Sequence, residues 1–254
     1  MHTEQSSRGN SPSASAWEAN MLCPGRHRAQ CGLPEGPQNP DAEAGQAIHA
    51  AWCDHPTRPL TLDEQDTLDV LRTKEMDILE RWTHAGCLTE GSVGEWREIR
   101  EMRLWHSWSA RLQTGPIELS CSGQADVIYL DPPRALILDG KTGRKVVTAE
   151  PGNLQLRTLA ALLAVNGRQL CGQQIQEVTV ALVQHWSASN PPCVYGIRAL
   201  HRASLEMMAN MEAWYAPTAR RSPHPTACEY CRAILVCPES RAIPDEIIRT
   251  ASRS

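Results

Sequence analysis

Two short apolar segments joined by a tight turn constrain the fold of this chain more than any other feature of its sequence. The segments span residues 117–130 and 135–138, and Asp131-Pro132-Pro133 separates them. Proline fixes its own backbone angle and has no amide hydrogen to donate, so this tripeptide predicts a turn. The apolar residues on either side are typical of strands, and the order strand, turn, strand predicts a hairpin within a sheet.

The segments around this hairpin predict a chain of helices and strands. Apolar residues recur at helical spacing in residues 15–23, 41–53, 61–82, 154–165 and 205–215. Further strands are predicted at residues 99–108, 177–185 and 194–200. Thr61 and Glu64 have the spacing of a capping box at the start of one helix. This order predicts an α/β fold, in which helices flank a mixed sheet and a helical region comes first.

Four regions are predicted along the 254 residues. Residues 1–15 are expected to be a flexible tail, and residues 16–98 a helical N-terminal region. Residues 99–216 hold the predicted α/β core, and residues 217–254 hold a Pro-rich linker and a cluster of cysteines. This length suits one domain with extensions, or at most two domains.

The composition excludes several classes of protein. Hydrophobic residues make up 41% and charged residues 21% of the chain, which favours a packed core over global disorder. No apolar run approaches the ~20 residues that span a bilayer, so no membrane partner is expected. The polar N-terminus lacks the apolar centre of a secretory signal, which predicts a cytoplasmic protein. With a net charge of −4, any contact with nucleic acid requires a local basic patch.

Two aspartates and a lysine gather around the predicted hairpin. Asp126 lies on its first strand, and Asp139 and Lys141 follow its second strand with the i, i+2 spacing that puts side chains on one face. Carboxylate oxygens, joined by the Gly140 carbonyl, suit Mg²⁺ or Mn²⁺, and such an ion activates water for phosphodiester hydrolysis. A lysine there would orient the water and offset the charge of the phosphate. The alternative is a solvated hairpin with ordinary turn residues.

The sequences GQADVIYL and LILDGKTG resemble two motifs of the PD-(D/E)xK nuclease superfamily, in its RecB-like exonuclease branch. The matching positions are residues 123–126 and 139–143. The resemblance implies a restriction-endonuclease-like fold, with residues 99–216 as the nuclease core. It also implies that Asp126 and Asp139 bind the catalytic metal and that Lys141 is catalytic.

Two further segments resemble motifs of the same family and occur in the same order. GQAIHAAW resembles the upstream G-x-x-x-H motif, which implies that His49 is an additional metal ligand. NLQLRTLAALLA resembles the Q-x-x-x-Y helix, which implies that Gln155 organises the active site and the substrate strand. Leu159 replaces the family tyrosine, a departure that affects a substrate contact and not metal binding. The alternatives are a histidine on a half-buried helix face and a surface glutamine.

Basic residues close to these motifs predict a DNA-binding patch. Arg144, Lys145 and Arg157 lie near Lys141 in the sequence or on the following helix, and phosphate contacts need such residues. A solvated turn is the alternative for Arg144 and Lys145. A second set of charges is interpreted as a salt-bridged surface and consists of Glu95, Arg97, Glu98, Arg100, Glu101 and Arg103.

Three of the ten cysteines cluster in CEYCRAILVCPE, with two and five residues between them. Thiolates at such spacing bind Zn²⁺ or an iron–sulfur cluster. Three local cysteines leave a fourth ligand to come from elsewhere in the chain. The single cysteines outside this cluster are most simply buried small hydrophobic residues.

The early segment SASAWEANMLCP supplies a candidate for the fourth ligand, Cys23. One early cysteine and three late ones are similar to the pattern of AddB-type helicase-nucleases and CRISPR-associated adaptation nucleases. The resemblance implies a [4Fe–4S] cluster on Cys23, Cys228, Cys231 and Cys237, which clips the two ends of the chain together. Zn²⁺ on the same cysteines is the alternative, and Cys31 competes with Cys23.

Together these features predict a metal-dependent DNA nuclease. The expected activity is that of an exonuclease on single-stranded DNA or DNA ends, in a recombination, repair, phage or defence context. One alternative is a catalytically silent DNA-binding accessory protein of recombination on the same fold. Another is a zinc-clipped interaction module, in which Asp126 and Asp139 are incidental. The sequence identifies no protein partner.

Overall fold

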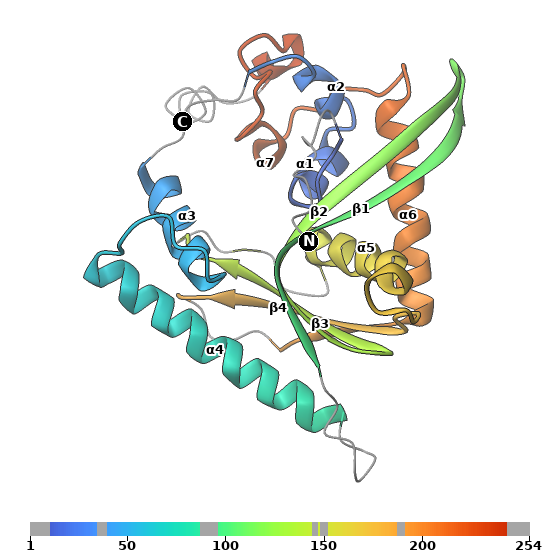
Figure 1. Cartoon of the computed structure of the whole chain (residues 1–254). Coiled ribbons are helices and arrows are strands. Elements are labelled where there is room, and N and C mark those ends of the chain that lie inside the picture. Colours follow the sequence, from blue (N-terminus) through green and yellow to red (C-terminus); the bar gives the residue numbers. More distant parts are fainter. Residues whose placement is uncertain are drawn as a thin grey trace.

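A five-stranded mixed sheet forms the centre of the protein in the computed structural model (Figure 1). The structure describes residues 11–34, 40–86, 96–143, 147, 152–186 and 191–242. The strands follow the order β1 (Arg97–Leu112), β2 (Gly115–Asp131), β3 (Arg134–Lys141), β4 (Glu177–Gln184) and β5 (Cys193–Gly196). The β3–β4 pair is parallel and the other neighbouring pairs are antiparallel.

Helices cover both faces of this sheet (Figure 1). One face packs against α5 (Leu154–Cys171) and α6 (Ile197–Tyr215), and the other against α3 (Pro40–Trp52) and α4 (Leu62–Gly86). Alternate residues of β2 enter the two cores, because successive side chains of a strand point to opposite faces. Among the described residues, no helix combines the length and apolar character needed to cross a membrane.

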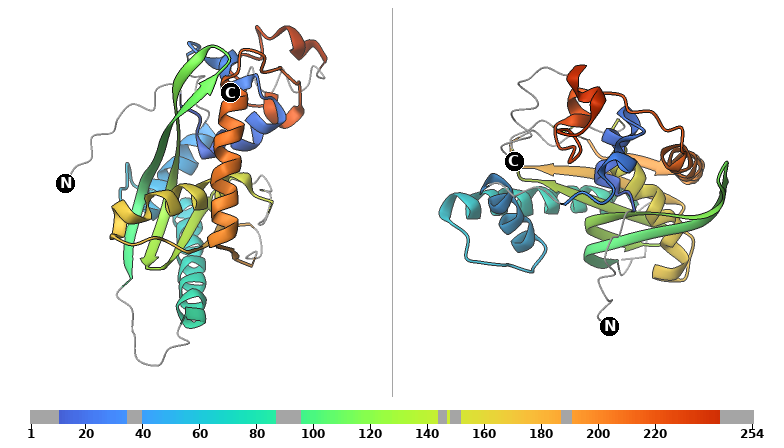
Figure 2. Two further views of the ribbon diagram at one scale, coloured as in Figure 1. Left: turned by 90° about the vertical axis from the view of Figure 1, so that its right-hand side faces the viewer. Right: turned by 90° about the horizontal axis from the view of Figure 1, so that it is seen from above.

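Short elements from both ends of the chain pack together at one end of the sheet (Figure 2). They are the 3-10 helix Ala14–Ala16, α1 (Trp17–Leu22), α2 (Arg26–Gln30), α7 (Pro225–Cys228) and the 3-10 helix Pro238–Ala242. The buried guanidinium of Arg26 donates hydrogen bonds to the carbonyl oxygens of Ala227 and Tyr230, each at 3.0 Å. A buried cation without such acceptors would be costly, so these bonds fix α2 against the C-terminal segment.

The predicted order of elements is confirmed. The hairpin turn lies at residues 132–133, between β2 and β3. The capping box is confirmed as well: the amide of Thr61 donates to Oε2 of Glu64 at 2.8 Å, and the amide of Glu64 donates to Oγ1 of Thr61 at 3.4 Å. Several elements extend further than predicted, since α4 continues to Gly86 and α5 to Cys171.

Two predicted segments differ from the structure. Residues 194–200 are not one strand, because β5 ends at Gly196 and α6 begins at Ile197. Leu200 is buried on the same face of α6 as the later core residues of that helix, and this packing outweighs the short apolar run. Residues 11–15 are not a tail: the amide of Ser122 on β2 donates to the carbonyl of Pro12 at 3.1 Å, and Ser13 pairs with Ser122.

Candidate active site

The β2–β3 hairpin places two aspartates side by side. Val127 on β2 pairs with Leu138 on β3. Because the strands are antiparallel, the preceding residue of β2, Asp126, lies opposite the following residue of β3, Asp139. The amide of Gly140 donates a hydrogen bond to Oδ2 of Asp126 at 2.7 Å. Both carboxylates are buried, with 7% of Asp126 and 1% of Asp139 exposed. The hairpin therefore holds two carboxylates together in a largely dry environment.

Lys141 and Gln155 complete one side of this group. Nζ of Lys141 lies 2.6 Å from Oδ2 of Asp139 and donates to Oε1 of Gln155 at 3.3 Å. Nε2 of Gln155 donates in turn to Oδ1 of Asp139 at 2.7 Å. Gln155 lies in the first turn of α5, where the Asn153 side chain caps the helix by accepting from the amide of Leu156 at 2.9 Å. The cap fixes the start of α5 and, with it, the position of Gln155.

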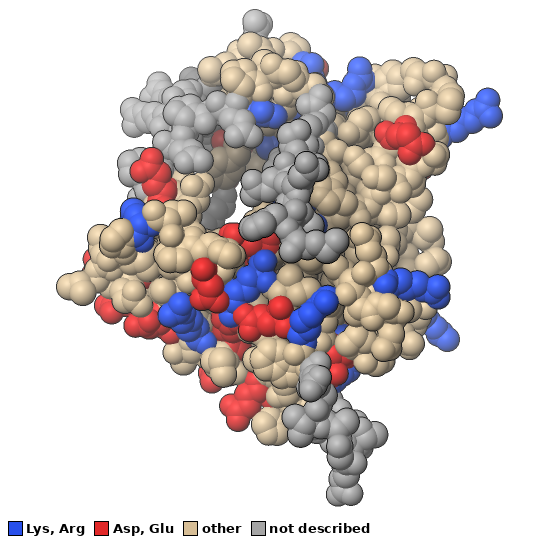
Figure 3. All heavy atoms as spheres, viewed as in Figure 1, with Lys and Arg blue, Asp and Glu red and all other residues tan. Residues whose placement is uncertain are grey.

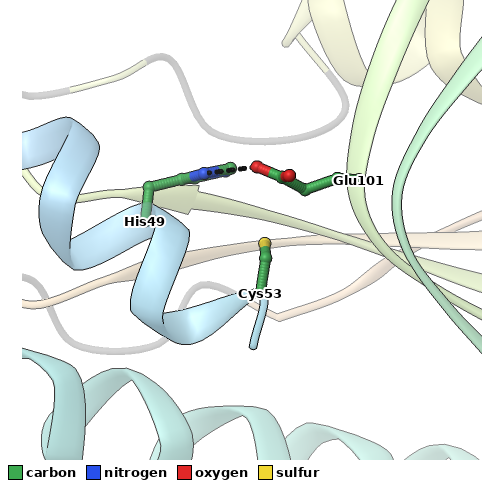
Figure 4. Close-up of side chains that lie close together, drawn as sticks. All are labelled: His49, Cys53 and Glu101. Carbon is green, nitrogen blue, oxygen red and sulfur yellow. Dashed lines mark ion pairs between the residues drawn. The ribbon is translucent and has the colours of Figure 1, made fainter. Parts of the chain in front are cut away.

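His49 approaches the aspartates from α3. Its Nε2 lies 2.8 Å from Oδ1 of Asp126. Its Nδ1 lies 3.3 Å from Oε1 of Glu101 (Figure 4). The ring of Trp52, one turn later on α3, packs on Gly140. A Cβ at position 140 would lie 2.3 Å from Cζ3 of Trp52, so only glycine lets α3 come this close to the end of β3.

Burial and mutual charge shift the ionisation of the group. Burial raises the pKa of Asp139 to about 6, helped by the charge of Asp126 and opposed by Lys141. Burial alone would lower the pKa values of His49 and Lys141, but the neighbouring carboxylates outweigh it and raise both. His49 and Lys141 therefore favour their charged forms, because the carboxylates around them attract positive charge.

The donors of this group fit a divalent cation. Two buried carboxylates lie side by side here, and Lys141, 2.6 Å from Oδ2 of Asp139, and His49, 2.8 Å from Oδ1 of Asp126, are the positive charges beside them. Adjacent buried carboxylates of this kind attract a further cation. Carboxylate oxygens, a carbonyl oxygen and an imidazole nitrogen are ligands that Mg²⁺ or Mn²⁺ accept.

The structure brings six of the predicted site residues together: His49, Asp126, Asp139, Gly140, Lys141 and Gln155. Arg157 instead forms an ion pair with Glu206 of α6 at 2.5 Å. Arg144 and Lys145 lie outside the described residues. On the face seen in Figure 3, basic and acidic side chains are interspersed over α4 and the neighbouring strands. This mixture agrees with the low net charge of the chain.

Glu101 is a site residue that the sequence did not reveal. It was predicted to lie in a salt-bridged surface, but its carboxylate faces His49 (Figure 4). The β1–β2 ladder is interrupted at Glu101, opposite Asp126, and the φ angle of Glu101 is 51°. Backbone strain of this kind in a residue other than glycine is concentrated at functional sites. Charge alternation along β1 gives no signal for it.

Arg100 forms an ion pair with Glu98, as the predicted salt-bridged surface implies, but it also reaches into the interior. Its guanidinium donates to Oε1 of buried Glu75 at 2.9 Å and to the carbonyl oxygen of Trp52 at 2.8 Å. Glu75 also accepts from Nε1 of Trp52 at 2.6 Å and from the hydroxyl of Tyr129. This buried network lies directly beneath the candidate site and connects α3, α4, β1 and β2.

Four cysteines line one cavity between the two ends of the chain: Cys23, Cys228, Cys231 and Cys237. Arg26 lines the same cavity, whereas Cys31 is exposed and does not. Burial raises the pKa of Cys231; the nearby thiols of Cys228 and Cys23 add to this shift and Arg26 opposes it. The early cysteine and the late ones, about 200 positions apart in the chain, are therefore neighbours.

Comparison with known families decides the class of this protein. A model described as the PD-(D/E)XK nuclease superfamily matches residues 11–238. The chain belongs to this superfamily. Membership confirms the predicted family and its α/β fold with a mixed sheet and a helical N-terminal region. It identifies the chain as a nuclease, a hydrolase of phosphodiester bonds, from a family that uses divalent metal ions.

Two solved structures are similar to this PD-(D/E)XK nuclease over most of their length. One is a candidate exonuclease from Eubacterium rectale, with 11% identity, a TM-score of 0.46, and coverage of 96% of this chain and 91% of that one. The other is SSO0001, with 12% identity, a TM-score of 0.36, and coverage of 94% and 89%. Comparison with curated proteins gives no match.

Proposed function

We propose that this nuclease is a divalent-metal-dependent exonuclease that degrades DNA from its ends and favours single strands. The observation that carries the proposal is the convergence of His49, Asp126, Asp139, Lys141 and Gln155 at the end of β3. The resemblance to RecB-like exonucleases, which extends over these same positions, supports the preference for ends. A recombination, repair, phage or defence context would fit such an activity.

The ligands of Mg²⁺ or Mn²⁺ would be Asp126, Asp139, the carbonyl of Gly140 and His49. When bound, the ion lowers the pKa of a water molecule and neutralises charge on the phosphate. Lys141 stays protonated beside Asp139, so its role is to orient the water and the phosphate rather than to remove a proton. Gln155 fixes the side chains of Lys141 and Asp139 relative to each other, because it hydrogen-bonds to both.

Glu101 has a supporting role in this proposal. A histidine that binds a metal through one ring nitrogen commonly donates the hydrogen on its other nitrogen to a carboxylate. Glu101 faces Nδ1 of His49 and Asp126 faces Nε2. Glu101 therefore favours the neutral tautomer of His49 with its hydrogen on Nδ1, which leaves Nε2 free to bind a metal ion beside the aspartates.

Arg144, Lys145 and Arg157 are the proposed DNA contacts. Arg157 is partly exposed and would exchange Glu206 for a phosphate when DNA binds. Leu159, in the place of the family tyrosine, is fully buried and packs on β2 at Gly123. It cannot reach a substrate, which is the observation that favours the second candidate, a silent DNA-binding accessory protein. The complete set of acidic residues and lysine favours the nuclease.

A comparison of linear and circular DNA tests the proposed exonuclease. With Mn²⁺, the protein should degrade end-labelled linear single strands at least about tenfold faster than covalently closed circles of the same length. Without a divalent ion, both substrates should stay intact. Release of label is followed on gels over time.

The other outcomes of this experiment are equally clear. Equal cleavage of circles and linear strands would replace the exonuclease with an endonuclease. DNA binding without cleavage of either substrate, by protein that binds Mn²⁺, would favour the accessory protein.

The four-cysteine cavity is proposed to hold a [4Fe–4S] cluster. Four thiolates suffice for such a cluster. The resemblance to nucleases with one early and three late cysteines supports an iron–sulfur cluster over Zn²⁺. The role of the cluster would be to join α1 and α2 to the C-terminal segment.

Replacing Cys228 with serine should remove the cluster. Wild-type protein purified without oxygen is expected to be brown and to contain about four iron atoms per chain. Cys228→Ser should lose most of the iron and the visible absorption, whereas Cys31→Ser should keep both because Cys31 lies outside the cavity. Colourless wild-type protein with one zinc atom per chain would contradict the iron–sulfur proposal.

A further inference from the structure

A second group of metal-binding side chains adjoins the aspartate pair. His49, Cys53 and Glu101 each offer a ligand atom, and these atoms all lie within 4.8 Å of one another (Figure 4). In the part of the chain that the structure describes, no other three histidine, cysteine or acidic side chains come this close. Cys53 has no part in the proposed nuclease mechanism. It packs in the core between α3, α4 and the sheet, and its sulfur points toward His49 and Glu101.

One of the three side chains is buried and the other two are partly exposed. Cys53 is 1% exposed, and its thiol lies 3.7 Å from the carbonyl oxygen of Asp126. The side chains of His49 and Glu101 are 25% and 30% exposed, so an ion can reach them from solvent. Three protein ligands and one open position are typical of zinc sites that keep a water ligand.

The mixture of donors favours one class of metal. The group offers one sulfur, one nitrogen and one carboxylate oxygen, whereas the aspartate pair offers mainly oxygen. Thiolate and imidazole ligands suit Zn²⁺, and Mg²⁺ and Mn²⁺ prefer oxygen. The two neighbouring groups therefore differ in the metal that each prefers.

The backbone holds these ligands in place before any ion binds. Cys53 directly follows α3, and Arg100, the neighbour of Glu101, donates to the carbonyl oxygen of Trp52 at the end of that helix. This bond joins the strand that carries Glu101 to the helix that carries His49 and precedes Cys53. Glu101 and Asp54 both have φ angles in the left-handed region, 51° and 62°. Such strain persists only where surrounding contacts enforce it.

We propose that His49, Cys53 and Glu101 form a zinc site that inhibits the neighbouring nuclease site. This proposal deepens the proposed function and rests on it, because both sites use His49. When Zn²⁺ binds, the Cys53 thiol and the charged ring of His49 each release one proton to solvent, and the Glu101 carboxylate contacts the ion instead of the hydrogen on Nδ1 of His49. His49 and Glu101 are then no longer available to support an ion at Asp126.

Zinc stoichiometry tests the site directly. Full-length wild type and variants are prepared in the same way, so that any zinc on the four-cysteine cavity contributes equally, and Zn²⁺ is titrated against a chromophoric chelator. Wild type should bind one more tight Zn²⁺ than Cys53→Ser. Glu101→Gln, which keeps the buried thiol, should lose the same ion. Cys171→Ser changes a cysteine outside both groups and should match wild type. Equal stoichiometry in wild type and both site variants would overturn the proposal.

Competition between the two ions tests the inhibition. The readout is bound Mn²⁺, followed by electron paramagnetic resonance, and it requires no DNA cleavage. Zn²⁺ should displace half of the Mn²⁺ from wild type at a concentration at least about tenfold lower than from Cys53→Ser. Equal concentrations would show that Zn²⁺ competes at the aspartates themselves, and would overturn the inhibitory role.

These readouts separate the zinc proposal from the nuclease proposal. Wild type that binds Mn²⁺ and shows zinc competition, but leaves DNA intact, would refute the proposed exonuclease and support the zinc site. Wild type that cleaves DNA and binds no extra Zn²⁺ relative to Cys53→Ser would refute the zinc site alone.

Discussion

Replacing Asp139 with asparagine should abolish DNA cleavage without unfolding the protein. Asparagine has the shape of aspartate but no charge, so it cannot neutralise Lys141 and binds a divalent ion far more weakly. Asp139 is buried between Lys141 and Gln155, and no other residue of β3 offers a carboxylate in its place. The expected loss is at least about a thousandfold in cleavage rate, the scale of a lost electrostatic contribution to the transition state.

Asp131→Asn provides the matched control for this experiment. Asp131 lies on the same hairpin, at the end of β2, and forms an ion pair with Arg134 away from the site. Its replacement should leave cleavage and Mn²⁺ binding unchanged. Thermal unfolding of both variants checks that the fold is intact. Wild-type cleavage by folded Asp139→Asn would refute the assignment of the active site, as would equal loss in both variants.

The central hairpin could be predicted because its determinants are local. A period of two in apolar residues and a proline turn fix the pairing of β2 with β3, and that pairing brings Asp126 to Asp139. His49 and Gln155 come from helices far away in the sequence, and spacing alone does not place them. Their positions were predicted from the order of family motifs, and the structure does bring them to the aspartates.

The contributions of Glu75 and Glu101 could not be predicted, because both depend on tertiary contacts. Glu101 reaches His49 through a left-handed backbone angle that no charge pattern encodes. Glu75 is an ordinary helical glutamate by sequence, and only the packing of α4 against the sheet buries it. The same reason applies to residues 197–200, where packing of the α6 face decided between a strand and a helix.

Replacing Glu75 with alanine should have the largest effect on stability. Glu75 is 3% exposed and accepts hydrogen bonds from Trp52, Arg100 and Tyr129. Alanine leaves a buried indole N–H and a buried hydroxyl without an acceptor and removes the buried partner of a guanidinium. Breaking a buried ion pair from one side costs about 3–5 kcal/mol. Because Arg100 keeps its ion pair with Glu98, the free energy of unfolding should fall by about 3 kcal/mol, the lower end of that range.

The same variant should also weaken metal binding, because the network supports the active site from below. Trp52 is held by Glu75 and packs on Gly140, between the Asp139 and Lys141 positions. Without Glu75, the indole of Trp52 is no longer held against Gly140, and the end of β3 loses this contact. Mn²⁺ affinity should therefore fall even under conditions where the protein remains folded. A buried glutamate that acted on stability alone would leave Mn²⁺ affinity unchanged in the folded variant.

Glu80→Ala and Glu75→Gln sharpen this test. Glu80 lies on the exposed side of α4, and its replacement should change the free energy of unfolding by no more than about 0.5 kcal/mol. Glu75→Gln keeps an acceptor oxygen but not the charge, so its loss should fall between those of the two alanine variants. Urea unfolding gives the stabilities, and Mn²⁺ titration of the folded proteins gives the affinities. If Glu75→Ala matched Glu80→Ala in both measurements, the network would have no part in supporting either the fold or the metal site.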